Sequence, residues 1–144
     1  MFNNILFVCI GNICRSPTAE VLMRRAVQGT DIRVSSAGLG ALVGRGIEPT
    51  AQALLLEHGL DGSDHRARQA DAAILEAADL ILTMERRHLS LITRRMPQVS
   101  GKTFLLGKWQ GDREISDPYR KQRVAFEHVF RLVDEGVASW RRYL

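Results

Sequence analysis

Short apolar runs alternate along the chain with stretches in which apolar residues recur at helical spacing. Residues 5–8 are continuously apolar, which is typical of a strand buried on both faces of a parallel sheet. Ile32 and Val34 alternate with polar neighbours, which indicates a half-exposed strand. Further runs at residues 80–83 and 103–106 complete a set of four predicted strands.

Helical patterns fill much of the remaining chain. Ser16-Pro17 is typical of a helix start, with serine as the N-cap and proline at the first helical position. Leu22 and Met23 then fall on one face, and Gly29 can end the helix. Further helices are predicted from Glu48-Pro49 to Gly59 and over residues 71–78, 85–95 and 119–142.

The alternation of strands and helices predicts an α/β fold with parallel strands and right-handed crossovers. We expect a single doubly wound domain over residues 1–144, with a four-stranded parallel sheet flanked by about five helices. In such sheets, ligands bind beyond the carboxyl ends of the strands, next to a helix N-terminus. The segment Cys9–Arg15 occupies that place in the sequence.

Composition narrows the class of protein. Hydrophobic residues make up 45% and charged residues 25%, as in soluble globular proteins. No apolar run approaches the ~20 residues that span a bilayer, and the first run has no basic lead-in of a signal peptide. We therefore expect a cytoplasmic protein without membrane insertion. The net charge of +4 and the 6% of aromatic residues do not favour nucleic-acid binding, although basic residues can steer an anionic substrate.

The only two cysteines, Cys9 and Cys14, lie close together near the N-terminus. Two cysteines make no disulfide framework, and the four histidines have no zinc-binding spacing, so no metal site is expected. Buried apolar filler is the simplest role for such cysteines. Their neighbours favour catalysis instead.

A loop that joins a buried strand to a helix can curl so that its backbone N–H groups point inward and bind an anion. Cys9 would lie at the base of this loop, where positive potential favours the nucleophilic thiolate. Arg15 can hold two phosphate oxygens in a bidentate pair. The predicted phosphate-binding residues are Ile10, Gly11, Asn12, Ile13, Cys14, Arg15 and Ser16.

Three residues of this loop have further expected roles. Gly11 is expected to allow a backbone geometry that a side chain would block. Asn12 tolerates a left-handed conformation. Ser16 can donate a hydrogen bond to the thiolate and cap the helix.

Phosphoryl transfer also needs a proton donor for the leaving oxygen. Asp117, in the sequence Asp117-Pro118-Tyr119, is the candidate general acid. Asp-Pro also commonly begins a turn, so a purely structural role is the alternative.

These motifs together resemble the low-molecular-weight protein tyrosine phosphatases over essentially the whole chain. The motifs are residues 8–17 (VCIGNICRSP), Asp117-Pro118-Tyr119, residues 35–38 (SSAG), residues 65–69 (HRARQ) and the strand end Leu82-Thr83-Met84. Residues 37–44 and 117–121 are similar to the bacterial branch tied to capsule or exopolysaccharide production, whose members act on tyrosine autokinases.

The resemblance implies a metal-independent phosphatase without cofactors that releases inorganic phosphate from a phosphotyrosine protein. Cys9 is then the nucleophile, Arg15 the phosphate clamp and Asp117 the general acid and later the base. Asn12 and Ser16 support the loop. The partners of Asn12 are expected to be Ser36 and His65, although His65 alone would suggest a packed surface histidine.

The resemblance also implies a slot for the aromatic ring of the substrate. Its expected walls are Leu39, Leu42 and Tyr119. Two departures affect it: Arg120 stands where many relatives have a second aromatic residue, and the facing loop is aliphatic, with Val43 beside Leu42. The slot is therefore expected to be open and aliphatic.

Two other functions use the same residues. A thiol-dependent arsenate reductase needs further cysteines to pass on a disulfide, and the chain has none beyond Cys14. A phosphotyrosine-binding adaptor would be expected to lack Cys9 or Asp117, and both are present. A redox role for Cys9 and Cys14 is a further hypothesis, in which Cys14 captures an oxidised Cys9 as a disulfide.

Overall fold

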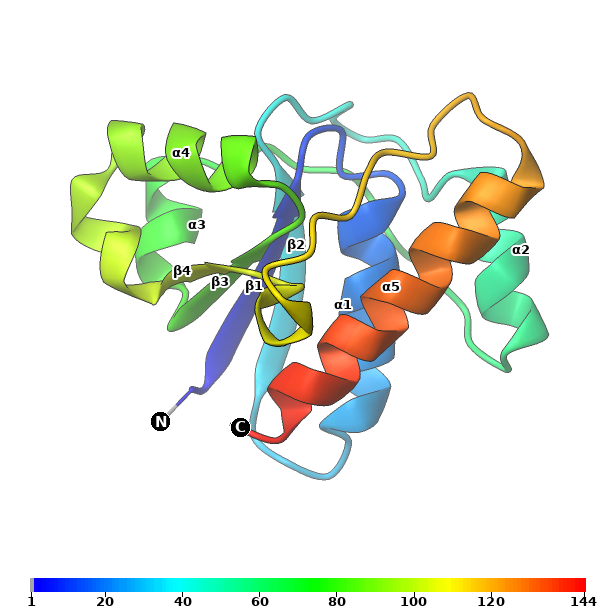
Figure 1. Cartoon of the computed structure of the whole chain (residues 1–144), viewed down its shortest axis with the longest axis horizontal. Helices are drawn as coiled ribbons and strands as arrows, with labels where there is room; N and C mark the ends of the chain where they lie inside the picture. Colours follow the sequence, from blue (N-terminus) through cyan, green and yellow to red (C-terminus); the bar gives the residue numbers. More distant parts are fainter. Residues whose placement is uncertain (1) are drawn as a thin grey trace.

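A four-stranded parallel sheet forms the centre of the computed structural model, which describes residues 2–144 (Figure 1). The strand order is β2-β1-β3-β4, and every neighbouring pair is parallel. The strands span Asn4–Cys9 (β1), Arg33–Gly38 (β2), Leu80–Thr83 (β3) and Thr103–Leu105 (β4). The predicted α/β architecture is confirmed.

Helices cover both faces of this sheet. Helices α1, α2 and α5 lie on one face, and α3 and α4 lie on the other (Figure 1). The helices span Arg15–Ala26 (α1), Pro49–Glu57 (α2), Ala72–Ala77 (α3), Arg86–Arg95 (α4) and Arg123–Arg141 (α5). Two short 3-10 helices, Pro97–Lys102 and Lys108–Gln110, flank β4. No helix within residues 2–144 has the length and apolar character needed to cross a membrane.

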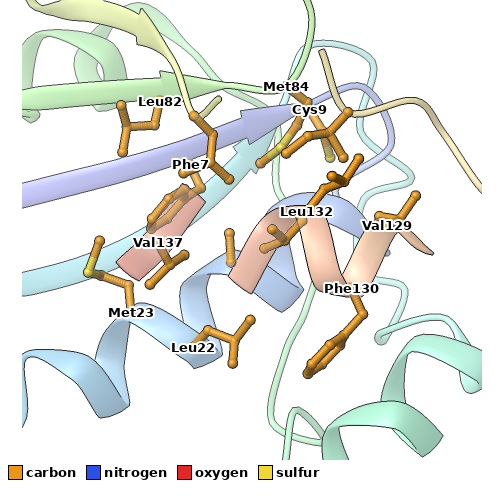
Figure 2. Packing of buried hydrophobic residues seen from close by; sticks show 14 of the residues in the cluster. Phe7, Cys9, Leu22, Met23, Leu82, Met84, Val129, Phe130, Leu132 and Val137 are labelled. Carbon is orange, nitrogen blue, oxygen red and sulfur yellow. The ribbon is translucent and has the colours of Figure 1, made fainter. Parts of the chain in front are cut away.

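Strand β1 divides its side chains between two cores. Ile5, Phe7 and Cys9 belong to the larger apolar cluster, which α1 and α5 cover (Figure 2). Leu6 and Val8 point to the smaller cluster on the α3 and α4 face. Because successive side chains of a strand point to opposite faces, this register places Cys9 on the α1 and α5 side of the sheet.

Two helix starts differ from the sequence-based prediction. Helix α1 begins at Arg15 with Cys14 at the N-cap, so Ser16 lies inside the helix and does not cap it. Helix α5 begins at Arg123 rather than at residue 119. Arg120 has a left-handed backbone with φ of 65°, which interrupts a helix, and it lies within a turn that Lys121 N–H closes on the Pro118 carbonyl.

Candidate active site

The loop between β1 and α1 has its carbonyl groups turned outward. The carbonyls of Cys9, Ile10 and Gly11 accept hydrogen bonds from the N–H groups of residues 39, 40 and 42, at 2.9–3.0 Å. The Ile13 carbonyl accepts from residue 48 at 2.7 Å, just before α2. Segments far from the loop in sequence therefore hold it from outside.

This arrangement turns the loop's N–H groups inward. A peptide unit is planar, so its N–H points away from its carbonyl. Within residues 2–144, none of the N–H groups of residues 10–14 donates a hydrogen bond to a protein acceptor. Five amide donors thus converge over the end of β1 and α1, which is an environment for an anion.

Cys9 and Asn12 share one hydroxyl partner. Cys9 Sγ lies 2.8 Å from Ser16 Oγ, and Asn12 Nδ2 donates to that oxygen at 2.8 Å. Asn12 Nδ2 also donates to Ser36 Oγ at 3.0 Å, and Ser36 in turn donates to Glu20 at 2.6 Å. Because Ser16 Oγ already accepts from Asn12, its own proton is free to point toward the sulfur.

Asn12 also holds the backbone of the loop. It has a left-handed φ of 57°, a conformation that asparagine tolerates. Its Oδ1 accepts from the Arg68 N–H at 2.9 Å. His65 Nε2 donates to the Asn12 carbonyl at 2.6 Å, so the structure brings both His65 and Ser36 to Asn12.

The glycine whose missing side chain the site requires is Gly38, not Gly11. A Cβ atom on Gly11 would meet side-chain atoms only at an ordinary 3.8 Å, and Gly11 has no left-handed φ. The expectation that Gly11 supplies a special geometry is wrong. A Cβ on Gly38, the last residue of β2, would lie 2.3 Å from the Ile10 carbonyl oxygen. The close approach of β2 to the loop therefore requires glycine at position 38.

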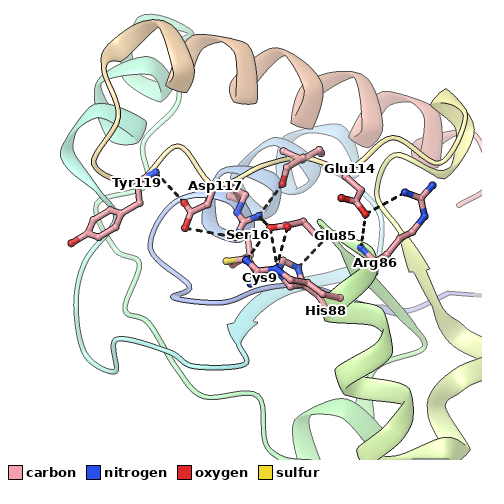
Figure 3. A network of polar contacts seen from close by, with 11 residues as sticks. Cys9, Ser16, Glu85, Arg86, His88, Glu114, Asp117 and Tyr119 are labelled. Atoms are coloured by element: carbon pink, nitrogen blue, oxygen red, sulfur yellow. Dashed lines mark hydrogen bonds and ion pairs between the residues drawn. The ribbon is translucent and has the colours of Figure 1, made fainter.

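Arg15 is almost fully buried and is held by one edge of its guanidinium. Its Nη1 donates to Glu85 Oε2 at 2.5 Å and to the Ile115 carbonyl at 2.8 Å (Figure 3). Within residues 2–144, its Nε and Nη2 have no hydrogen-bond acceptor, and Nη2 lies 3.9 Å from Asp117 Oδ2. This leaves two parallel donors for a bidentate anion.

Glu85 is a functional residue that the sequence reasoning missed. It lies two residues after the end of β3, and its side chain is paired with Arg15 and Arg87. Burial would raise the pKa of Glu85, but the hydrogen bonds from these two arginines outweigh that effect and lower it. The signal that could have found it is an acidic residue just past the carboxyl end of the strand beside β1.

His88 lies behind Glu85 and is fully buried. The two form a capping box at the start of α4, in which His88 Nδ1 accepts from the Glu85 N–H at 3.2 Å. Burial, and then the charge of Arg15, lower the pKa of His88 to about 4. A neutral histidine therefore supports the carboxylate that holds Arg15.

Asp117 and Tyr119 approach the loop from the segment before α5. The side chain of Asp117 is nearly half exposed, at 46%, and its Oδ1 accepts from the Tyr119 N–H at 3.0 Å. The guanidinium groups of Arg120 and Arg45 beside the Tyr119 hydroxyl lower the pKa of this phenol. Asp117 is thus in contact with solvent and with the edge of Arg15.

These groups surround a cavity of about 190 Å³. Leu42 and Tyr119 line it, as expected, but Gly40 lines it in place of Leu39. Leu39 packs instead against the apolar cluster under α3 and α4, so the structure does not bring it to the slot. The lining residues are Cys9, Ile10, Gly11, Asn12, Ile13, Cys14, Arg15, Gly40, Leu42, Asp117 and Tyr119.

Cys14 also lines this cavity, but its thiol is not activated as a nucleophile. Both cysteines are buried and free. Burial raises the pKa of Cys14 strongly, and the nearby Cys9, Glu48 and Asp117 add to the effect, so Cys14 is a neutral thiol. In the part of the chain from residue 2 onward, no three His, Cys, Asp or Glu side chains group as a metal site would require.

Comparison with known proteins gives a consistent result. The family model described as low molecular weight phosphotyrosine protein phosphatase matches residues 4–144. The low molecular weight protein-tyrosine-phosphatase Wzb of Escherichia coli K12 is 48% identical over 144 residues, covering 100% of this chain and 97% of that protein.

Solved structures agree with this match. The tyrosine phosphatase AmsI of Erwinia amylovora superposes with a TM-score of 0.95 at 45% identity, covering 100% of this chain and 94% of the other. Wzb of Vibrio vulnificus in complex with benzylphosphonate has a TM-score of 0.95 at 38% identity, with 100% of both chains covered. With the family model matched over nearly its whole length and these relatives aligned end to end, the chain belongs to the low molecular weight phosphotyrosine protein phosphatases and is an enzyme of that family.

Proposed function

We propose that this enzyme hydrolyses phosphotyrosine in proteins through a phosphocysteine intermediate on Cys9. The observation that supports this most is the ring of inward amides at residues 10–14 around the Cys9 side chain. A dianionic phosphate would lie in that ring, with its phosphorus facing Sγ. The buried Arg15 would add its Nε and Nη2 donors.

In the first step, the Cys9 thiolate attacks phosphorus and the bond from phosphorus to the tyrosyl oxygen breaks. Asp117 gives its proton to the departing phenolate. The amides and Arg15 bind the equatorial oxygens, where charge develops in the transition state. The Ser16 hydroxyl, 2.8 Å from the sulfur, can donate to the Cys9 thiolate before attack and to the sulfur again when it leaves phosphorus in the second step.

In the second step, Asp117 takes a proton from a water molecule, which attacks phosphorus. The bond from sulfur to phosphorus breaks, inorganic phosphate leaves, and the thiolate returns to Cys9. Asn12, Ser36 and His65 keep the loop in the same shape throughout, because their contacts are with its backbone or with Ser16. None of these steps uses a metal ion or an organic cofactor.

The depth of the cavity accounts for a preference for tyrosine. Cys9 lies at its base and is only 2% exposed, while Leu42 and Tyr119 form its walls. A phenyl ring can carry a phosphate down to the sulfur, and a phosphoserine side chain is too short. The benzylphosphonate bound by the Vibrio vulnificus relative has this aryl shape.

For the physiological substrate, we propose the phosphorylated tyrosine segment of a bacterial autokinase that controls capsule or exopolysaccharide synthesis, with the reaction in the cytoplasm. The resemblance of residues 37–44 and 117–121 to that branch supports this choice. The basic balance of the chain suits an anionic segment.

The decisive test uses Cys9→Ser beside the wild-type enzyme. Wild type should release phosphate from a phosphotyrosine peptide, and rapid acid quench with mass spectrometry should find one phosphate on Cys9. Cys9→Ser should lose turnover yet still bind phosphate, because the amides and Arg15 are unchanged. Substantial turnover by Cys9→Ser would contradict the covalent mechanism.

The same assay separates the alternative functions. An adaptor would bind the phosphopeptide without releasing phosphate. An arsenate reductase would consume arsenate with thiol and leave the phosphopeptide intact.

A substrate-trapping experiment tests the partner. Cys9→Ser, expressed in its own cells, should retain a phosphorylated autokinase that free phosphate can elute. Recovery of unrelated phosphoproteins alone would count against the autokinase.

A further inference from the structure

A second cavity adjoins the catalytic one. It has a volume of about 320 Å³, and it shares two lining residues, Ile13 and Tyr119, with the catalytic cavity. Tyr119 is therefore a wall between the two. Figure 3 shows the Tyr119 side chain on the side of Asp117 that faces away from Cys9.

Three cations line this second cavity. They are Arg45, from the loop after β2, and Arg120 and Lys121, from the turn before α5. Within residues 2–144, none of the three forms an ion pair with a carboxylate. Surface arginines such as Arg86 and Arg123, by contrast, are paired.

One acidic side chain in the cavity offsets only part of the positive charge of these three cations. Glu48 is the one acid among the described lining residues, and its carboxylate accepts from the Thr50 N–H as the cap of α2. Arg120 is fixed by its place over the Tyr119 ring, 5.4 Å from the centroid. Its left-handed φ of 65° turns the chain there and brings Arg120 and Lys121 to the cavity together.

The floor of the cavity is apolar. Ile13 and Phe126 are buried, and Ile47 is half-buried beside them. An apolar floor with cations around it matches a flat ring that ends in a dianion, and matches a short carboxylate side chain less well. Small-molecule sites commonly combine an apolar lining with a few placed polar groups in this way.

We infer that this second cavity binds a second phosphotyrosine of the same substrate chain while the first is hydrolysed at Cys9. This inference rests on the proposed function and adds a substrate class: segments with neighbouring phosphotyrosines. Arg45, Arg120 and Lys121 are then specificity-determining residues that hold the second phosphate, and they take no part in the chemistry.

The test compares peptides that differ only beside one phosphotyrosine. The neighbouring position carries phosphotyrosine, tyrosine or glutamate, at successive distances on either side, and mass spectrometry follows loss of phosphate from the common site. Wild type should hydrolyse the common site with a kcat/KM at least about fivefold higher when the neighbour is phosphotyrosine, as expected for paired charges at a partly exposed site. The gain should shrink at high salt.

Charge-removing variants identify the cavity. Arg45→Gln combined with Lys121→Gln, and Arg120→Gln alone, should lose this gain. The gain is measured within each variant as the ratio of kcat/KM for the doubly and singly phosphorylated peptides, so a change in basal hydrolysis through Tyr119 cancels. Arg142→Gln is the matched control, since it removes one exposed charge near the C-terminus, far from the cavity. It should keep the gain.

Each remaining outcome would overturn the inference. These are no gain in wild type, an equal gain with glutamate, a gain that survives in the variants, or a gain that Arg142→Gln also loses. If wild type hydrolyses the singly phosphorylated peptide but shows no gain, only this inference fails. If it hydrolyses no phosphotyrosine peptide, the proposed function fails as well.

Discussion

At the scale of single residues, Asn12 shows what a sequence pattern can and cannot foretell. The tendency of asparagine to adopt a left-handed backbone led to the correct expectation for its φ. The structure also brings Ser36 and His65 to it, but His65 reaches the carbonyl of Asn12 and not its side chain. The contact with the Arg68 N–H had no signal, since a backbone donor looks alike at every position in a sequence.

Asp117 is expected to act only on the leaving group. Asp117→Asn should slow hydrolysis of a phosphate with a poor leaving group about 100-fold or more, because that oxygen needs a proton. Activated aryl phosphates should lose much less rate, so the dependence on leaving-group pKa should steepen. A series of substituted phenyl phosphates measures this dependence, and an equal loss for all of them would assign Asp117 a structural role.

Cys14 is expected to protect Cys9 from irreversible oxidation. Peroxide would convert the Cys9 thiolate to a sulfenic acid, and attack by Cys14 sulfur would form the disulfide and release water. After peroxide and then thiol treatment, wild type should recover more activity than Cys14→Ser. Because the pKa of buried Cys14 is strongly raised, disulfide formation should be slow and should speed up with rising pH.

The comparison of wild type with Cys14→Ser decides whether Cys14 has this protective role. Equal recovery of the two proteins, without a Cys9–Cys14 linked peptide in the mass spectrum, would leave Cys14 a structural residue of the loop.

At the scale of elements, the close contact between β2 and the loop predicts a contrast between two glycines. Gly38→Ala should lower the free energy of unfolding by about 2 kcal/mol and impair activity, because its Cβ has no room against the Ile10 carbonyl. Gly11→Ala should change that free energy by about 1 kcal/mol or less. Denaturant unfolding of both variants gives the comparison, and equal stability of the two would contradict the contact.

The start of α4 predicts a dependence of stability on pH. The pKa of His88 is about 4 in the folded protein, well below the ordinary value, so the unfolded chain binds the proton first as the pH falls. The free energy of unfolding should therefore be highest above about pH 6.5 and should fall by about 3 kcal/mol as the pH drops toward 4.

Two variants assign this effect to His88. His88→Asn keeps an acceptor for the Glu85 N–H and should flatten the pH dependence across that window. His128→Gln, at an exposed position of α5, should leave the dependence unchanged. A steep dependence that persists in His88→Asn would point to other groups.

Sequence patterns predict the presence of helices and strands better than they predict where these elements begin and end. The apolar runs of β1 and β3 located the strands correctly, because a short, continuously apolar run is compatible with few structures other than a buried strand. The start of α5 was placed too early. The spacing of apolar residues does not reveal that Arg120, before the helix, has a left-handed backbone. Ser16 looked like a helix cap by position, yet its hydroxyl is used by Cys9 and Asn12.

At the scale of the whole molecule, the proposed chemistry needs no metal. Treatment with a chelator should leave hydrolysis of an aryl phosphate unchanged, since five backbone amides and Arg15 supply the positive potential. Kinetics before and after dialysis against chelator measure this. Loss of activity that a divalent cation restores would count against the proposed mechanism.

Reasoning from the residues alone predicted the site only where it is local in sequence, and the distant partners Ser36 and His65 were expected only from the family resemblance. The loop from Cys9 to Ser16 could be recognised from adjacent residues, and Asp117 from its own motif. Glu85 and the Ile115 carbonyl hold Arg15 from 70 and 100 residues away, and such contacts appear only when β3 and the chain before α5 meet beside β1. Long-range pairing of this kind depends on the three-dimensional arrangement of the sheet.

The outward carbonyls of the loop have a consequence for damaged copies of the enzyme. The groups that hold them come from residues 39–48 and from His65, so the loop has no shape of its own once those segments separate. A partly unfolded molecule therefore retains the cysteine but not the ring of amides that makes it a phosphatase. In a cell, damaged copies would therefore lose activity and would not become unspecific hydrolases. The phosphorylation that the enzyme removes would then persist for longer.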